Sequence, residues 1–250
     1  MPIKKGQVEL IGTERKISLP YALNRRRGLR RLRCSLDFQG RLCLAVPWSC
    51  SENQAWDFVH SKADWIAQRW QEIQQEPGLY EFLSKQKWLS LDGEKVPLRM
   101  IQREDSAASL RAASVKEIVL QIPSAMETDR DFVLREIILG FARRVIPRRV
   151  EKLSQESGIL YNRIAIRDQR SRWGSCSCSG TLSLNWRLCL VPPMVQDYVI
   201  YHELAHRRQM NHSVHFWTEV SRCCPEYKRF DTFLRQKGNR YMRLGRTGEA

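Results

Sequence analysis

Residues 202–212 hold three of the chain's five histidines, and the segment opens with the pattern H-E-x-x-H, formed by His202, Glu203 and His206. In an α-helix, side chains four residues apart lie one above the other, so the two imidazoles face a single point. Imidazoles at that spacing are typical zinc ligands. Glu203 lies beside the first ligand, within reach of the metal's open coordination position. The pattern therefore predicts a zinc-dependent hydrolytic site.

The same pattern also arises on surface helices that carry two histidines and a glutamate by chance. The flanking residues argue against that interpretation, because they are apolar enough for a largely buried helix. They are Val195, Tyr198, Val199, Ile200, Leu204 and Ala205. Buried histidines need partners for their ring nitrogens, and a metal ion together with an outer-shell acceptor supplies them. We therefore interpret the segment as a metal site.

Spacing leaves three candidates for the third protein ligand. His212 lies six residues after the second histidine of the pattern, as in the longer motif H-E-x-x-H-x-x-G-x-x-H. Gln209 stands where that motif has glycine, which should make a sharp turn costlier. His215 and Glu219 lie on the next predicted helix, which Ser213 is placed to cap. Spacing favours His212 only slightly, and the other two remain alternatives.

Composition bounds the class of protein. The 250 residues are 42% hydrophobic, enough for a packed core, and no apolar run is long enough to span a membrane. The first residues lack the apolar stretch of a signal peptide, so we expect a cytoplasmic protein. In that reducing compartment the eight cysteines should be free and mostly buried. A second metal held by Cys176 and Cys178 is a minor alternative, and the adjacent Cys223 and Cys224 match no zinc motif.

The net charge is +15, and the arginines come in clusters. These are Arg25, Arg26, Arg27, Arg30, Arg31 and Arg33; Arg143, Arg144, Arg148 and Arg149; and Arg163, Arg167, Arg170 and Arg172. Such a balance is typical of proteins that bind nucleic acid or an acidic partner, although a solvated basic surface has the same composition. No nucleic-acid-binding motif accompanies the charge. Non-specific nucleic-acid binding is therefore a candidate partner interaction on charge alone.

The first half of the chain reads as strands around one long helix. Strands are predicted at 7–19 and 29–46, with a turn at Gln39–Gly40, and again as short segments over 87–122, with turns at 92–93 and 105–108. A capping box at Ser51–Gln54 opens the helix, and Pro77–Gly78 ends the segment. Its apolar positions have helical spacing: Trp56, Val59, Ala63, Ile66 and Trp70.

The second half alternates helices and strands. A long helix is predicted over 129–157, with a kink or break at Pro147 and an end at Gly158. Paired strands follow at 163–168 and 181–190. Pro192–Pro193 opens the H-E-x-x-H helix, and two short helices divided near Pro225 close the chain. The fold class is α+β, with a strand-rich region over 1–125 and a catalytic domain over 126–250.

Several motifs, in order, resemble the YgjP-like metallopeptidases. They are R-W-G-S-C from Arg172, L-N-W-R-L from Leu184, H-E-L-A-H from His202 and N-H-S from Asn211. With weaker similarity around residues 63–66 and 93–98, the resemblance covers most of the chain. It implies a zincin-like catalytic domain and one zinc ion. Carried onto this sequence, it implies His202, His206 and His212 as the ligands and Glu203 as the catalytic glutamate.

The expected activity is hydrolysis of a polypeptide, with Glu203 as general base. Tyr198, Asn185 and Arg172 are candidates for contacting the substrate or the transition state. The strand over 181–188 is expected to pair with extended substrate. Two alternatives remain: hydrolysis of a non-peptide amide, and a DNA-associated protease of the SprT type or a basic nucleic-acid-binding module.

Overall fold

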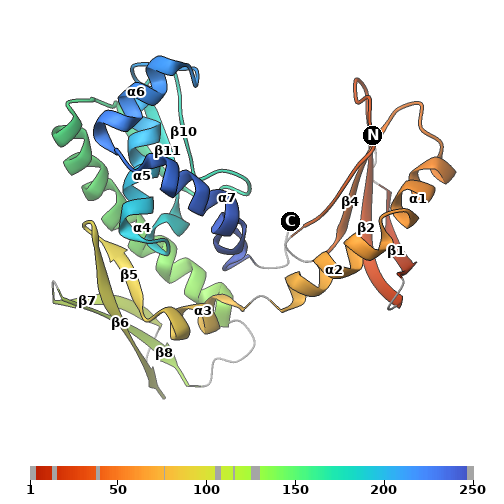
Figure 1. Ribbon diagram of the computed structural model, residues 1–250. Helices are drawn as coiled ribbons and strands as arrows, with labels where there is room; N and C mark the ends of the chain where they lie inside the picture. Colours follow the sequence, from red (N-terminus) through yellow and green to blue (C-terminus); the bar gives the residue numbers. More distant parts are fainter. Residues whose placement is uncertain are drawn as a thin grey trace. The chain divides into compact units, whose positions relative to one another are not determined.

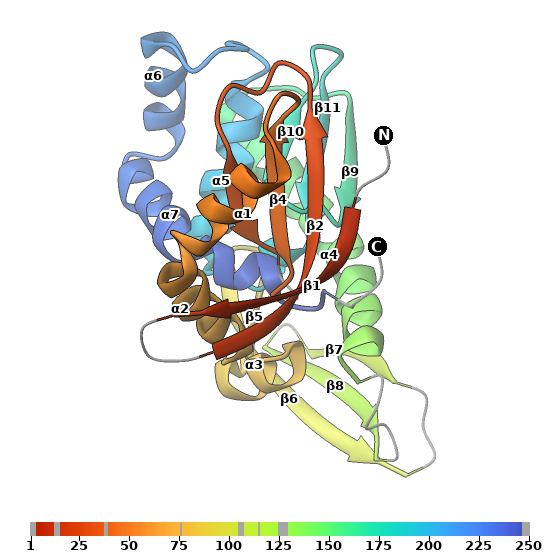
Figure 2. The same ribbon diagram turned by 90° about the vertical axis from the view of Figure 1, so that its right-hand side faces the viewer.

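The computed structural model is α+β, as expected, and is drawn in two views (Figures 1 and 2). It describes residues 4–12, 16–37, 40–75, 77–104, 108–114, 116–124 and 130–246. Chain contacts divide it into two compact units between residues 76 and 77. Each unit has its own hydrophobic core. Among the described residues, none of the helices combines the length and apolar character needed to cross a bilayer.

The N-terminal unit is a four-stranded sheet with two helices on one face (Figure 1). The strand order is β1-β2-β4-β3, with β1 Lys4–Ile11, β2 Lys16–Arg26, β3 Arg33–Leu36 and β4 Leu42–Pro47. The central pair β2 and β4 is parallel, and both edge strands are antiparallel to their neighbours. The strand predicted over 7–19 is thus divided into β1 and β2. The segment 29–46 is divided around the predicted turn, where the Gly40 amide donates to the Asp37 carbonyl at 3.1 Å and Gln39 lies outside the described residues.

The capping box at Ser51 is confirmed, because its hydroxyl accepts from the Gln54 amide and the Gln54 side chain accepts from the Ser51 amide. The predicted single long helix is wrong. The segment forms α1 Glu52–His60 and α2 Ala63–Gln74, separated at Ser61–Lys62. Two short helices can each turn an apolar face to the same side of the sheet, where Val59 and Ile66 are fully buried.

The second unit begins with a helix that the sequence reading did not identify. This is α3 Leu79–Gln86, whose first amides donate to the carboxylate of Asp131 at 2.6 and 2.9 Å. A four-stranded sheet follows in the order β5-β6-β8-β7, with β5 Trp88–Leu91, β6 Glu94–Arg103, β7 Ser109–Ser114 and β8 Glu117–Pro123. The turn at Asp92–Gly93 is confirmed, with positive φ at both residues. Most of the turn predicted at 105–108 lies outside the described residues.

The rest of the second unit holds the H-E-x-x-H segment. The elements are α4 Arg130–Ser157, β9 Arg163–Arg167, β10 Gly174–Cys176, β11 Thr181–Asn185, the 3₁₀ helix η1 Trp186–Cys189, α5 Pro193–Ala205, α6 Val214–Cys223 and α7 Tyr227–Arg243. Helix α4 continues through Pro147 without the predicted break, because buried Ile146 and Val150 hold it against the core on both sides of the proline. Gly158, with φ of 66°, follows the helix end as predicted.

Strand β11 lies in the centre of a three-stranded sheet of order β10-β11-β9 (Figure 2). It pairs antiparallel with β10 and parallel with β9. Both of its edges are therefore occupied. The expectation that the strand over 181–188 pairs with substrate is wrong, because no free backbone groups remain there for an added strand.

The division at 76/77 differs from the boundary at 125/126 that the sequence suggested. The reason is packing rather than local structure. The sheet β5–β8 contributes Leu89, Val96 and Ile118 to the same core as the H-E-x-x-H helix α5. These strands therefore belong with the helices that follow them.

Candidate metal centre

Helix α5, which carries the H-E-x-x-H pattern, is buried on almost every side and fixed by polar contacts. Asp197 accepts two hydrogen bonds from the Arg149 guanidinium of α4, at 2.7 and 2.5 Å. Gln196 donates to the Leu188 carbonyl at 3.0 Å. Pro193 forms the first turn, as the sequence predicted. These contacts fix the rotation and height of α5, and therefore the positions of the side chains at its C-terminal end.

Three imidazoles converge where α5 ends. His202 lies in the last turn, His206 is the C-cap residue, and His212 lies on the connection to α6. Their ligand atoms all lie within 4.8 Å of one another, and the Nε2 atoms of His202 and His212 are 3.1 Å apart. The Nδ1 of His206 contacts the Gln209 carbonyl at 3.1 Å. That carbonyl fixes the proton on Nδ1 and leaves Nε2 free to bind a metal.

The connection from α5 to α6 explains why a glutamine suffices at the position where the longer motif has glycine. Among the described residues, positive φ outside glycine occurs only at Lys87 and Asp92, so Gln209 turns without a left-handed conformation. The backbone amide of Gln209 donates to the Ala205 carbonyl at 3.0 Å, which continues the helical hydrogen bonding for one more turn. Ser213 then caps α6, as predicted, by accepting from the Phe216 amide.

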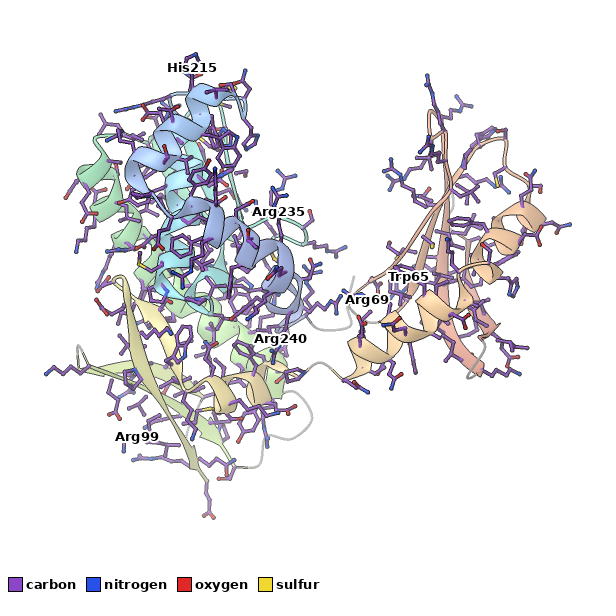
Figure 3. All side chains as sticks on the ribbon, viewed as in Figure 1. Trp65, Arg69, Arg99, His215, Arg235 and Arg240 are labelled. Atoms are coloured by element: carbon purple, nitrogen blue, oxygen red, sulfur yellow. The ribbon has the colours of Figure 1, made fainter. Side chains whose placement is uncertain are left out.

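The two rival ligands lie outside this cluster. His215 is exposed on the first turn of α6, at the outer end of that helix (Figure 3). Glu219 is held by Arg208 at 2.7 Å and by Arg222 at 3.4 Å. Among the described residues, the three imidazoles of His202, His206 and His212 form the only group with metal-ligand geometry.

The surroundings favour neutral imidazoles, the form that binds metals. Burial, reinforced by the neighbouring histidines, lowers the pKa of His202 to about 3, and burial also lowers the pKa of His206. The ring of Phe216 packs against all three imidazoles, with centroids 4.5–4.9 Å away. The Nδ1 of His202 is buried and has no hydrogen-bond partner within the described part of the chain.

Glu203 is buried beside the first histidine, with 5% of its surface exposed, and its carboxylate lies against strand β10. A β-carbon added at Gly174 would lie only 2.6 Å from the Cγ and Oε1 atoms of Glu203. Burial raises the pKa of the Glu203 carboxyl to about 8, and the positive charge of Arg172 opposes that rise. A carboxylate of raised basicity beside a metal centre is suited to accept a proton.

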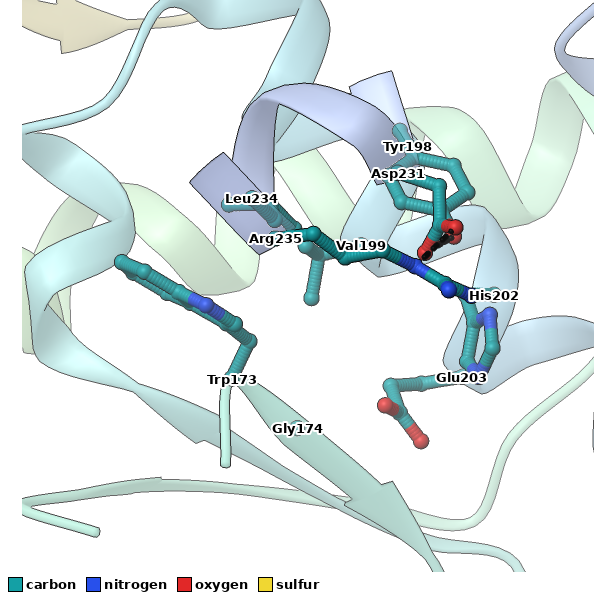
Figure 4. Close-up of a pocket in the computed structure, with 9 residues that line it drawn as sticks. All are labelled: Trp173, Gly174, Tyr198, Val199, His202, Glu203, Asp231, Leu234 and Arg235. Atoms are coloured by element: carbon teal, nitrogen blue, oxygen red, sulfur yellow. Dashed lines mark hydrogen bonds and ion pairs between the residues drawn. The ribbon is translucent and has the colours of Figure 1, made fainter. Parts of the chain in front are cut away.

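A pocket of about 340 Å³ opens beside Glu203 and His202 (Figure 4). Its other lining residues come from β10 and the segment before it, from α5 and from α7: Trp173, Gly174, Tyr198, Val199, Asp231, Leu234 and Arg235. The carboxylate of Asp231 accepts from the Tyr198 hydroxyl at 3.2 Å and pairs with Arg235 at 2.7 Å. The pocket is therefore apolar in its walls, with one neutralised ion pair.

Gly174→Ala is expected to reduce hydrolysis at least about tenfold while the metal stays bound. The new methyl group overlaps Glu203, so either the carboxylate or β10 must shift, at a cost of about 1–3 kcal/mol in overpacking. The control is Gly140→Ala in α4, where an added β-carbon meets nothing within 4 Å, and which should not affect hydrolysis. Equal activity of both variants would show that Gly174 does not set the position of Glu203.

A family model described as "YgjP-like, metallopeptidase domain" matches residues 30–237. The chain belongs to the YgjP-like family. The match spans both compact units, so membership is not carried by the H-E-x-x-H segment alone. It establishes a metallopeptidase-type domain and confirms the resemblance found in the sequence motifs.

Comparison with solved structures gave a more distant similarity. The crystal structure of the metallopeptidase zymogen of Pyrococcus abyssi abylysin shares 24% identity, covers 37% of this chain and 94% of its own, and has a TM-score of 0.34. At that score the likeness adds nothing to the family match. A comparison with curated proteins gave no significant match.

The three residues that the sequence suggested for contacting the substrate or the transition state lie in different parts of this YgjP-like chain. Tyr198 lines the pocket, and burial beside Asp231 raises the pKa of its hydroxyl, which therefore stays protonated and donates to Asp231. Arg172 is exposed and acts on Glu203 through its charge. Asn185 is fully buried and does not line the pocket. Its amide donates to the carbonyls of Gln169 and Arg172, at 2.9 and 3.1 Å, and thereby holds the segment that leads into β10.

Sequence reasoning missed the pocket wall formed by α7. Asp231, Leu234 and Arg235 carry no motif, and only the folded chain brings them to α5. Gly174 had a signal, because a glycine inside a strand often marks a close approach of another group. All eight cysteines are free, and Cys176 and Cys178 belong to no metal-ligand cluster of the described residues.

Proposed function

We propose that the chain is a zinc-dependent peptidase with one ion held by His202, His206 and His212. The observation that carries the proposal is the convergence of three imidazoles beside a buried carboxylate. Three imidazoles are a ligand set that hydrolytic zinc sites use, and they leave one coordination position open. The donor atoms present thus fit the ion that the family implies.

Glu203 is the general base of the proposed reaction. A zinc ion held by the three imidazoles would supply a Lewis acid that polarises the scissile carbonyl and acidifies water. The Glu203 carboxylate accepts the proton of the attacking water and then delivers it to the leaving nitrogen. Burial among apolar groups keeps the basicity of this carboxylate high before substrate binds. Arg172, whose positive charge acts on Glu203, is proposed to stabilise developing negative charge. Tyr198, whose hydroxyl proton is donated to Asp231, is proposed to contact the substrate in the pocket.

Strand β10 replaces β11 as the proposed backbone-recognition strand. It is an edge strand of its sheet, and its first residue, Gly174, borders both the pocket and Glu203. An extended polypeptide that adds to this edge would place its own backbone beside the general base. Main-chain pairing of this kind makes few demands on substrate sequence, while the pocket beside Glu203 accepts one side chain.

The test is hydrolysis of an unstructured polypeptide and of a panel of small non-peptide amides, before and after removal of metal. We expect cleavage of the polypeptide only, loss of cleavage with a chelator, and recovery when zinc is restored. Mass spectrometry of the products locates the cleaved bonds. Cleavage of the small amides alone would overturn the peptidase assignment, and undiminished cleavage by metal-free protein would overturn the metal-dependent mechanism.

A further inference from the structure

The first arginine cluster of the sequence lies at one end of the N-terminal sheet, which we call the arginine edge. Because β2 and β4 are parallel, their carboxyl ends meet at the same edge, and β3, antiparallel to β4, begins there. The register pairs Arg26 with Pro47 and Arg33 with Ala45. This arginine edge consists of Arg25, Arg26, Arg27, Arg30, Arg31, Arg33 and Trp48. Topology thus brings together two loops, one before β3 and one after β4.

Contacts between the two loops show that the arginine edge is a formed surface. Arg25 links β2 to the loop after β4, because its guanidinium donates to the Cys50 carbonyl and, at 3.4 Å, to the Trp48 carbonyl. The guanidinium of Arg27 lies over the Trp48 ring, 5.4 Å from its centroid. The Trp48 side chain is nevertheless 42% exposed. An exposed indole beside guanidinium groups offers both an aromatic face and positive charge to a ligand.

Few carboxylates lie around this edge, although Glu52, which pairs with Lys4, also interacts electrostatically with Arg25. Residues 20–50 contain seven arginines and a single carboxylate, Asp37, which pairs with Arg41 at 3.6 Å. The five arginines other than Arg25 are exposed. Residues on the sheet face turned away from α1 and α2 are small where the edge begins: Asn24 and Ala45 lie side by side in the register. The exposed arginines therefore share this end of the sheet with the exposed indole.

We propose that the arginine edge binds single-stranded nucleic acid without sequence preference. The exposed guanidinium groups pair with backbone phosphates, and the released counterions supply most of the affinity. The Trp48 ring offers a stacking face to an unpaired base, which a duplex does not present and an acidic polypeptide does not possess. This proposal concerns the N-terminal unit and does not depend on hydrolysis at the metal centre.

The test measures binding of the full-length protein to a labelled oligodeoxythymidine of about 20 nucleotides, longer than a typical single-strand site. Fluorescence anisotropy is recorded between about 50 and 200 mM salt. A variant with Arg26, Arg27 and Arg30 changed to Ala should bind at least about tenfold more weakly at low salt. Its salt slope should fall by about two, since single strands contribute roughly 0.7 per neutralised phosphate.

Two sets of variants separate the parts of the proposal. A control with Arg143, Arg148 and Lys152 changed to Ala loses the same charge from exposed positions of α4 and should bind like the wild type. Trp48→Ala should weaken binding about fivefold or more, in line with stacking of one base, and Trp48→Phe should restore most of it. Circular dichroism of each variant confirms that the fold is retained.

Three results would overturn the proposal. Equal losses in the α4 control would mean that overall charge, not the arginine edge, attracts the oligonucleotide. Tighter binding of polyglutamate than of the oligonucleotide would assign the surface to an acidic protein. Unchanged binding by Trp48→Ala, or tighter binding of a duplex, would remove the stacking contact that makes the site specific for single strands.

Discussion

Glu203→Gln is expected to keep its metal and its fold and to lose hydrolysis by about 10²- to 10⁴-fold, the range for a general acid–base group. Glutamine has nearly the same shape as glutamate, so the tight contact with Gly174 is preserved. Its amide cannot accept the proton of the attacking water. Burial of an uncharged amide also costs less than burial of a carboxylate, so the variant should be no less stable than the wild type. The measurements are kcat/KM, metal content and thermal unfolding.

The matched control for that variant is Glu219→Gln. It makes the same chemical change on α6, at a carboxylate held by Arg208 and Arg222 instead of facing the pocket. Its kcat/KM should stay within about fivefold of the wild type, because partly exposed ion pairs contribute at most about 1 kcal/mol. Normal turnover by Glu203→Gln with metal bound would remove the general-base role. A parallel loss of metal would instead assign Glu203 a part in holding the ion.

The features that the sequence predicted correctly are local ones. The capping box at Ser51 and the turn at Asp92–Gly93 depend on a few neighbouring residues, and both are present. The helical spacing of His202 and His206 is likewise a property of a single element. Short-range patterns therefore located two of the three clustered imidazoles, and the distance from His206 to His212 is short enough for the same reasoning to suggest the third.

Features that depend on long-range pairing escaped the sequence reading. Nothing in the sequence of β11 says that β9 and β10 occupy its two edges, because strand order arises from packing. The sequence suggested a catalytic role for Asn185, but its side-chain amide donates to two backbone carbonyls instead. The wall of the pocket from α7 is also nonlocal, since Asp231 lies 33 residues from the Tyr198 hydroxyl that it accepts from. Packing between distant segments also explains why the units divide at 76/77, earlier in the chain than the 125/126 boundary that the sequence suggested.

His212→Ala is expected to strip the metal, and His215→Ala is expected to retain it. The two residues are three positions apart and are both exposed, so the pair differs in one respect: only His212 brings a ring nitrogen to the other two imidazoles. Loss of a direct ligand should lower zinc affinity by more than the 10- to 100-fold that loss of an outer-shell partner costs. Metal content after dialysis against a weak chelator measures the difference.

Thermal unfolding gives a readout of the same prediction that needs no substrate. A ligand that binds only the folded state stabilises it by RT ln(1 + [L]/Kd), about 2.7 kcal/mol at a hundredfold excess over Kd. Added zinc should therefore raise the Tm of metal-free wild type and of His215→Ala, and barely move that of His212→Ala. The opposite pattern would make His215 the ligand and would require the start of α6 to unwind, because Ser213 caps that helix two residues earlier. A zinc-dependent rise in all three proteins would mean that two imidazoles and another donor hold the ion.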